Sequence, residues 1–129
     1  MVEEGTGRGV LIDFGLCTDE NEVVSTREGT LGYLAPEGLK GPTLVAKKSI
    51  DVYAFACTIV AAFSGMSPFN VGGGGLNTMR RQLSGEIELS HNFPEGLVSL
   101  IGRCLVDCEK SRPTMNELLL GLVAAKEVL

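Results

Sequence analysis

The sequence lacks the cysteine and histidine pattern of a metal-binding domain. Its four cysteines, Cys17, Cys57, Cys104 and Cys108, include no pair with C-x-x-C spacing, and His91 is the only histidine. A structural zinc site needs four such ligands, usually in closely spaced pairs. The pattern therefore argues against a zinc site and indicates reduced thiols, as in intracellular proteins.

The sequence also has too few clustered positive charges to bind nucleic acid. It contains 11 Lys and Arg against 16 Asp and Glu, which gives a net charge of −5 at pH 7. The basic pairs Lys47-Lys48 and Arg80-Arg81 are too small to form a patch. Because phosphate backbones are bound by clustered Lys and Arg, we expect no nucleic-acid partner.

A long apolar run is absent as well. The longest one, residues 50–63, is interrupted by Asp51, whereas a membrane-spanning helix needs about 20 apolar residues. The first four residues include two acidic ones, Glu3 and Glu4, where a secretory signal would be basic. We therefore expect no membrane segment in this chain and a cytoplasmic location.

What is present is the composition of a globular domain with a core. Apolar residues make up 44% and charged residues 21% of the 129 residues, which fits one domain. The residue pattern predicts a mainly α-helical fold with a short strand or hairpin at the N-terminus. The expected elements are a glycine-rich turn at 5–9, a strand at 10–12, an irregular loop at 16–34, a helical turn at 36–39, a linker at 72–75, and helices at 50–64, 76–83, 94–105 and after 114.

The helix expected at 50–64 is apolar on every face, so it should be enclosed by other parts of the protein. Ser49 is the expected N-cap, and Gly65 and Pro68 are expected to end the helix. The last helix should begin with a capping box, because Thr114 stands three residues before Glu117.

Three motifs in a fixed order carry the functional information. Asp13-Phe14-Gly15 follows the apolar residues 10–12, a G-T-x-x-Y segment spans 29–33, and Ala35-Pro36-Glu37 comes directly after it. In this order the sequence resembles the eukaryotic protein kinases, in which D-F-G and A-P-E bound the activation segment. The resemblance covers almost the whole chain and implies a C-terminal lobe that begins shortly before D-F-G. It divides the chain into an activation segment, 13–37, and a helical subdomain, 38–129.

The resemblance implies roles for the D-F-G residues. Asp13 would hold the magnesium ion that bridges the phosphates of ATP, within a cofactor-binding motif completed by Phe14 and Gly15. ATP and Mg²⁺ are the implied cofactors of a full-length parent, and the sequence leaves open whether this chain alone binds either. The chain contains no His-Arg-Asp motif and no paired metal-binding Asn, so we expect no catalytic base in it and no kinase activity from it alone.

The resemblance also assigns residues of the activation segment. Gly29 and Thr30 would receive the substrate residue that follows the phosphorylated one. Tyr33-Leu34 stands where tyrosine-specific kinases usually have a basic residue and Trp, so serine/threonine specificity is favoured. Ser25 and Thr26 are either phosphorylation sites or incidental hydroxyls of a solvated loop, and the sequence leaves both interpretations open.

Three further residues are given structural roles by the resemblance. Glu37 would form a buried ion pair with Arg112, because either charge alone would be costly to bury. Asp51 would face the catalytic loop, which this chain lacks, and would be left buried without a partner. The central helix should likewise have one face bare, which favours self-association or a docking partner.

Three functions remain open on the sequence alone. The chain is part of an active serine/threonine kinase that acts on protein substrates, a pseudokinase-like interaction module without catalysis, or a degenerate copy. The intact D-F-G and A-P-E motifs, Asp51 and Arg112 weigh against the last.

Overall fold

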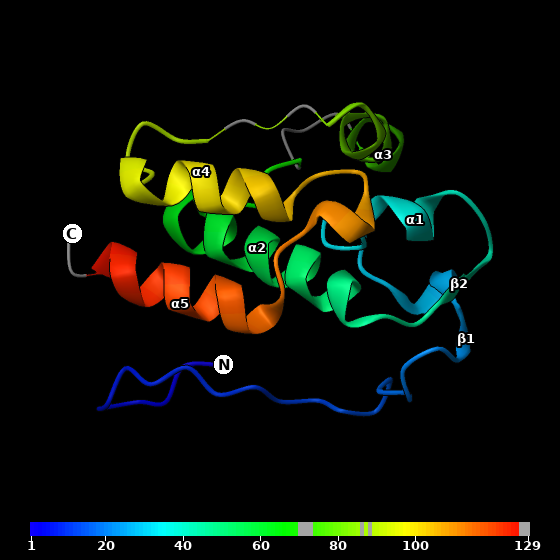
Figure 1. The fold of residues 1–129 in the computed structure, drawn as a ribbon, viewed down its shortest axis with the longest axis horizontal. Helices are drawn as coiled ribbons and strands as arrows, with labels where there is room; N and C mark the ends of the chain where they lie inside the picture. The colour runs from blue at the N-terminus through cyan, green and yellow to red at the C-terminus, as the bar shows by residue number, and fades with distance from the viewer. Residues whose placement is uncertain (70–73, 86, 88, 127–129) are drawn as a thin grey trace.

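The computed structural model describes residues 1–69, 74–85, 87 and 89–126 of the chain. It is mainly helical, with a small two-stranded antiparallel sheet towards the N-terminus, as the sequence predicts (Figure 1). In chain order the elements are β1 (Val23–Ser25), the 3-10 turn η1 (Thr26–Glu28), α1 (Pro36–Leu39), β2 (Thr43–Val45), α2 (Lys48–Ser64), α3 (Gly75–Ser84), α4 (Glu95–Cys104), the 3-10 turn η2 (Glu109–Ser111) and α5 (Met115–Lys126).

Helix α2 lies at the centre of the helical part, between α4 and α5 (Figure 1). Its apolar side chains form the core together with residues from α4 and α5 and from the segments between the helices. The buried core residues of these three helices are Val52, Tyr53, Ala56, Cys57, Val60, Leu97, Leu100, Ile101, Cys104 and Leu118. Burial of these side chains is the main contribution to the stability of the helical part.

One face of α2 is open, as the resemblance leads us to expect, although the composition of the helix alone predicts that it is enclosed on all sides. Asp51, Phe55, Thr58 and Ala62 are exposed, and their spacing of three or four residues places them in one stripe along the helix. Phe55 is 42% exposed. The other faces are mostly covered by the packed helices, with Phe63 near the C-terminal end of α2 as a further exposed side chain.

The ends of α2 differ in how well the sequence predicts them. The expected cap, Ser49, lies inside the first turn, and Lys47 takes the N-cap position with an extended backbone and no side-chain capping bond. The prediction of Ser49 as the N-cap is therefore wrong. The helix begins two residues earlier than predicted, because the backbone is already helical from Lys48. At the other end Gly65 adopts the left-handed conformation, and its N–H bonds to the Ala61 carbonyl at 2.8 Å, as predicted.

The strand expected at residues 10–12 is not formed. Leu11 and Ile12 are 81% and 50% exposed, and among the described residues no strand pairs with them. An apolar run forms a strand only where a neighbouring strand satisfies its backbone groups, and the pattern alone cannot supply one. The glycine-rich segment before it does form a hairpin turn, closed by a single bridge between Val2 and Gly9.

Strand β1 lies within the loop expected at 16–34, and strand β2 follows α1. β1 pairs with β2 in antiparallel register, with Val24 opposite Leu44. Each strand has three residues, too few to display the alternation that identifies a strand in sequence. The sheet joins the middle of the expected activation segment to the residues just after A-P-E.

The remaining helices start close to their predicted positions. α3 begins at Gly75, one residue early, and the expected linker at 72–75 lies partly outside the described residues. α5 follows Thr114, whose hydroxyl accepts a bond from the Glu117 N–H at 3.2 Å while the Glu117 carboxylate accepts one from the Thr114 N–H at 2.8 Å. This reciprocal pair is the predicted capping box.

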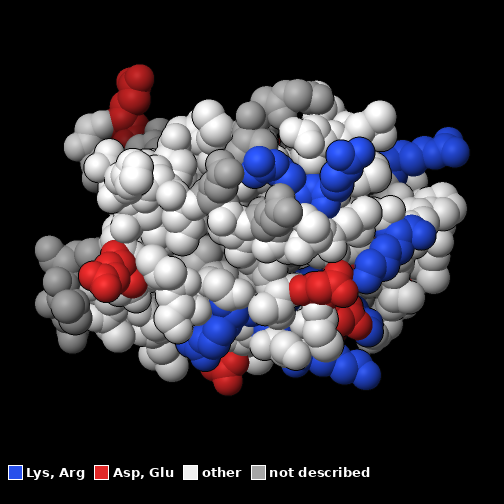
Figure 2. All heavy atoms as spheres, turned by 90° about the horizontal axis from the view of Figure 1, so that it is seen from above, with Lys and Arg blue, Asp and Glu red and all other residues white. Residues whose placement is uncertain are grey.

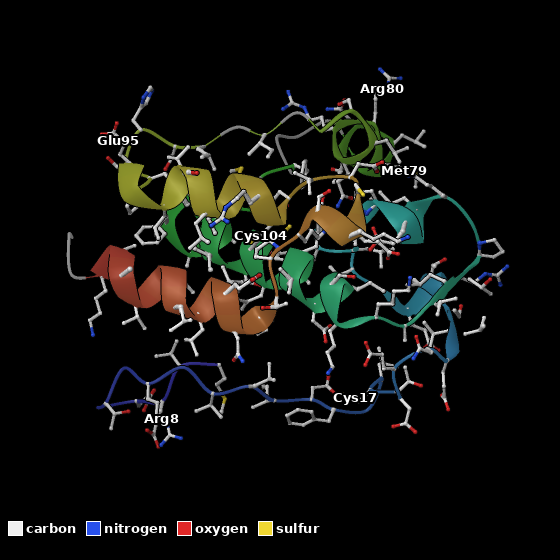
Figure 3. All side chains as sticks on the ribbon, in the orientation of Figure 1. Arg8, Cys17, Met79, Arg80, Glu95 and Cys104 are labelled. Atoms are coloured by element: carbon white, nitrogen blue, oxygen red, sulfur yellow. The ribbon has the colours of Figure 1, made fainter. Side chains whose placement is uncertain are left out.

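The cysteines are all unpaired. Cys57 and Cys104 are buried, and burial raises the pKa of the Cys57 thiol to about 12 and that of Cys104 to about 11. Figure 3 shows Cys104 inside the helical part and Cys17 on the N-terminal segment. The two buried thiols therefore stay protonated at neutral pH and act as core side chains.

None of the helices in the described ranges combines the length and apolar character needed to cross a membrane.

The capping box gives a first test of the fold. Thr114→Ala removes the hydroxyl that accepts the Glu117 N–H, and we expect it to lower the free energy of unfolding by about 1 kcal/mol. Asn116→Ala, an exposed change in the same helical turn, is the matched control and should have little effect. Urea denaturation followed by circular dichroism measures both. Equal stability of the Thr114 variant and the wild type would show that the box contributes nothing.

Candidate functional site

The D-F-G residues lie on the exposed N-terminal segment. Asp13 adopts a left-handed backbone conformation with φ of 64°, which is uncommon for a residue with a side chain. Its carboxylate is exposed, and the Phe14 side chain is 61% exposed. No group of three His, Cys, Asp or Glu residues that could hold a metal is found in the part of the chain that the structure describes. Asp13 is therefore a single candidate ligand here.

A shallow open depression follows the D-F-G residues and is lined by Cys17, Thr18, Asp19 and Glu22. Two of these four residues are carboxylates. They would repel the phosphates of a nucleotide, so this depression is not a candidate nucleotide pocket.

The two candidate phosphorylation sites differ in accessibility. Ser25 is exposed, and its hydroxyl accepts a hydrogen bond from the Arg27 N–H at 3.3 Å. The Thr26 hydroxyl is partly buried and donates to the Gly41 carbonyl at 2.8 Å, which ties η1 to the segment before β2. A modifying enzyme can therefore reach Ser25 without breaking this tie, whereas modification of Thr26 would break it.

The expected substrate segment begins exposed and becomes buried along its length. Gly29 and Thr30 are exposed, whereas Gly32 is buried. The Thr30 carbonyl accepts bonds from the N–H groups of Tyr33 and Leu34 at 3.1 and 3.0 Å, which turns the backbone back on itself. The buried part of this turn packs against α3.

At the end of the expected activation segment, Glu37 and Arg112 form a bidentate ion pair. The two guanidinium Nη atoms donate to the two carboxylate oxygens at 2.7 and 2.8 Å. The remaining N–H groups donate to the backbone carbonyls of Ser49, Val106 and Asp107. Arg112 has five N–H donors, and all of them are used, so its charge is buried without an unsatisfied group.

The same guanidinium lies over the ring of Tyr53, 5.0 Å from the ring centroid. Tyr53 is fully buried in α2 and stacks on Phe69, with ring centroids 6.2 Å apart. Burial raises the pKa of its phenol, so the hydroxyl is neutral at all physiological pH values. Arg112 thus joins α1, the start of α2 and the segment before α5 at one point.

Asp51 does not have the expected environment. It lies in the first turn of α2 with an exposed side chain. The cost of a buried, unpaired carboxylate therefore does not arise in this chain, because solvent hydrates the group. A carboxylate at this position also interacts favourably with the positive end of the helix dipole.

Charged side chains are unevenly placed on the face above α3 and α4. Figure 2 shows Lys and Arg in separate groups, mostly towards the α3 end, with acidic side chains between some of them. Arg80, on α3, points away from the molecule (Figure 3). The α3 end of this face therefore carries more Lys and Arg than its opposite end.

Comparison with known proteins agrees with the motifs. The profile of the family described as "Protein kinase domain" matches residues 1–121. Serine/threonine-protein kinase PkaA of Streptomyces coelicolor is 31% identical over 122 residues, which cover 92% of this chain and 22% of that protein. The probable serine/threonine-protein kinase PBL11 of Arabidopsis thaliana is 33% identical over 132 residues, covering 84% of this chain and 33% of that protein.

A third relative is a mitogen-activated protein kinase kinase of Pyricularia oryzae, MST7, which is 30% identical and of which the chain covers 29%. This chain belongs to the protein kinase family. It spans only about a fifth to a third of the length of these relatives.

Sequence reasoning missed two residues of the site, Gln82 and Tyr53. Gln82 on α3 contacts the backbone of residues 32–34, some 50 positions earlier in the chain. Tyr53 appears in the sequence only as one apolar residue of the central helix. Neither lies in a motif, and their role depends on contacts between distant segments.

The Glu37–Arg112 pair can be tested by removing either partner. Glu37→Ala or Arg112→Ala leaves a largely buried charge without its counterion, and we expect each to lower the melting temperature by several degrees, from a loss of about 3 kcal/mol. Lys40→Ala is the control, because the Lys40–Asp107 pair is exposed at 56% and 62% and should contribute little. Unchanged melting in both Glu37 and Arg112 variants would contradict the assignment.

Proposed function

We propose that these residues form the C-terminal part of a serine/threonine protein kinase domain, with an activation segment at 13–37 and a helical subdomain at 38–129. The observation that carries this proposal is the arrangement of residues 29–37. This segment has an exposed first part and an end fixed by the Glu37–Arg112 pair. A loop that receives a peptide needs such an accessible surface on a rigid base.

In this proposal Asp13 holds the magnesium ion of bound ATP. A carboxylate is a hard oxygen donor, which Mg²⁺ prefers, and that of Asp13 is exposed and free of the core. The left-handed backbone at Asp13 also supports a functional role, since such conformations are frequent at ligand-binding sites. When bound, the ion offsets charge on the transferred phosphoryl group. Phe14 and Gly15 complete the motif by orienting this carboxylate.

The substrate in this proposal is a protein with a serine or threonine acceptor. Gly29 and Thr30 receive the residue after the acceptor, because they are the exposed part of the segment. Tyr33-Leu34 before A-P-E favours the serine/threonine type, and the names of the relatives support it. Ser25 is the better of the two candidate phosphorylation sites, since its side chain is exposed and that of Thr26 is engaged with Gly41.

The magnesium role can be tested in the complete protein that carries these residues. Asp13→Asn removes the charge that would hold the ion, and we expect phosphate transfer to a serine/threonine peptide mixture to fall at least about a hundredfold. Asp19→Asn, a nearby exposed acid, is the matched control and should retain activity.

Radiolabelled ATP measures the transfer. Equal activity of the Asp13 variant and the wild type would contradict the assignment. We further expect the 129 residues alone to transfer no phosphate, since they include no His-Arg-Asp motif. Robust transfer by the isolated chain would overturn that expectation.

A second candidate function is a protein-interaction module that does not need catalysis. It is favoured by the exposed apolar side chains on α2 and α5. Those more than 40% exposed are Phe55, Phe63, Met115, Leu119, Leu120 and Val123. Exposed apolar side chains in this number commonly mark a binding site, and a second copy of the chain is the simplest occupant.

Self-association can be measured directly. Sedimentation velocity over a range of concentrations should show a concentration-dependent oligomer for the wild-type chain. Leu120→Lys places a charge on the apolar face of α5 and should shift the protein towards the monomer. Leu76→Lys, at an 83% exposed position of α3, is the control and should not. A compact wild-type monomer at high concentration would rule out this association.

A further inference from the structure

A single side chain of α3 binds the backbone of the substrate segment at two points. The Gln82 carboxamide oxygen accepts a hydrogen bond from the Gly32 N–H at 3.3 Å. Its Nε2 donates to the Leu34 carbonyl at 2.8 Å. Gln82 is only 2% exposed, so both bonds form away from solvent. Both kinds of atom in the carboxamide are used, and they bracket the backbone of Tyr33.

The backbone at Gly32 is fitted closely against its surroundings. Gly32 has φ of 94°, in the left-handed region that favours glycine. A Cβ atom at this position would lie 2.8 Å from the Ser67 hydroxyl oxygen. A side chain at this position would therefore clash with Ser67, and on the α3 side the Gln82 carboxamide holds the backbone of the turn.

Leu31, one residue earlier, lies against the start of α3. Its Cδ2 atom is 3.2 Å from where a Cβ of Gly75 would be, and 37% of the residue is exposed. The segment thus meets α3 at two places, by Leu31 at its first turn and by Gln82 at its last. The exposed surface at Gly29 and Thr30 continues directly from this contact.

The Gln82 side chain is enclosed by protein, since only 2% of the residue is exposed. Its two bonds described above both go to the backbone of the substrate segment, at Gly32 and Leu34. A buried amide that left these partners would lose both bonds without gaining water in their place.

We propose that Gln82 is a positioning residue of the substrate segment, which fixes the backbone of residues 32–34 and so sets the shape in which Gly29 and Thr30 meet a peptide. This inference rests on the proposed function and adds to it a residue from α3, outside the activation segment. It assigns α3 a role in peptide recognition, because this carboxamide links the last turn of α3 to the backbone of the segment.

The first test measures the positioning itself. Gln82→Leu has a similar size and removes both hydrogen bonds, so amide hydrogen exchange at Gly32 should become roughly tenfold faster. Leu118→Ala is the control, because it opens a cavity in α5, which lies far from α3 in Figure 1. It should lower the melting temperature without a selective change at Gly32. Equal exchange at Gly32 in the Gln82 variant and the wild type would overturn the proposal.

The second test measures peptide recognition in the complete protein. With a serine/threonine peptide mixture, Gln82→Leu should raise KM for the peptide roughly tenfold and leave KM for ATP unchanged, and Leu118→Ala should change neither. An unchanged peptide KM in Gln82→Leu would overturn the recognition role even if exchange is faster. If the wild-type complete protein transfers no phosphate, the proposed function is overturned. The hydrogen-exchange experiment then still decides whether Gln82 positions the segment.

Discussion

The bidentate pair between Glu37 and Arg112 is the interaction on which the rest of the structure depends. Its guanidinium bonds to α1, to the first turn of α2 and to the segment before α5, and it also covers the ring of Tyr53. A buried charge tolerates few alternative arrangements, because each lost hydrogen bond leaves an uncompensated group. The pair therefore fixes Ala35-Pro36-Glu37 to the helical core.

A second constraint acts on the same segment from α3. Gln82 holds the backbone at Gly32 and Leu34, and Arg112 holds the side chain of Glu37 a few residues later. Between these two anchors the backbone has little freedom, whereas Gly29 and Thr30 before them remain exposed. A surface of this kind, accessible but rigidly supported, suits the recognition of an extended peptide.

The chain belongs to the protein kinase family, and these contacts are interpreted in that context. The open stripe of α2 is a separate feature, which favours a binding partner. The chain spans a minor part of its relatives' length. Asp13 lies on a segment with exposed apolar neighbours such as Phe14, while the core is concentrated around α2. In the proposed function, the part of the site that would face a peptide is supported by the helical core, and the part that would face a metal ion depends on a single exposed carboxylate.

The sequence by itself determined the family motifs, the helical class and the capping box at Thr114, because each depends on residues close together in the chain. It did not determine that residues 10–12 stay unpaired or that β1 pairs with β2, since pairing needs a partner strand that local pattern cannot name. Nor did it reveal Gln82, which reaches a backbone about 50 residues away. Only the tertiary structure decided these features, because hydrogen bonds and burial between distant segments arise after the helices have packed.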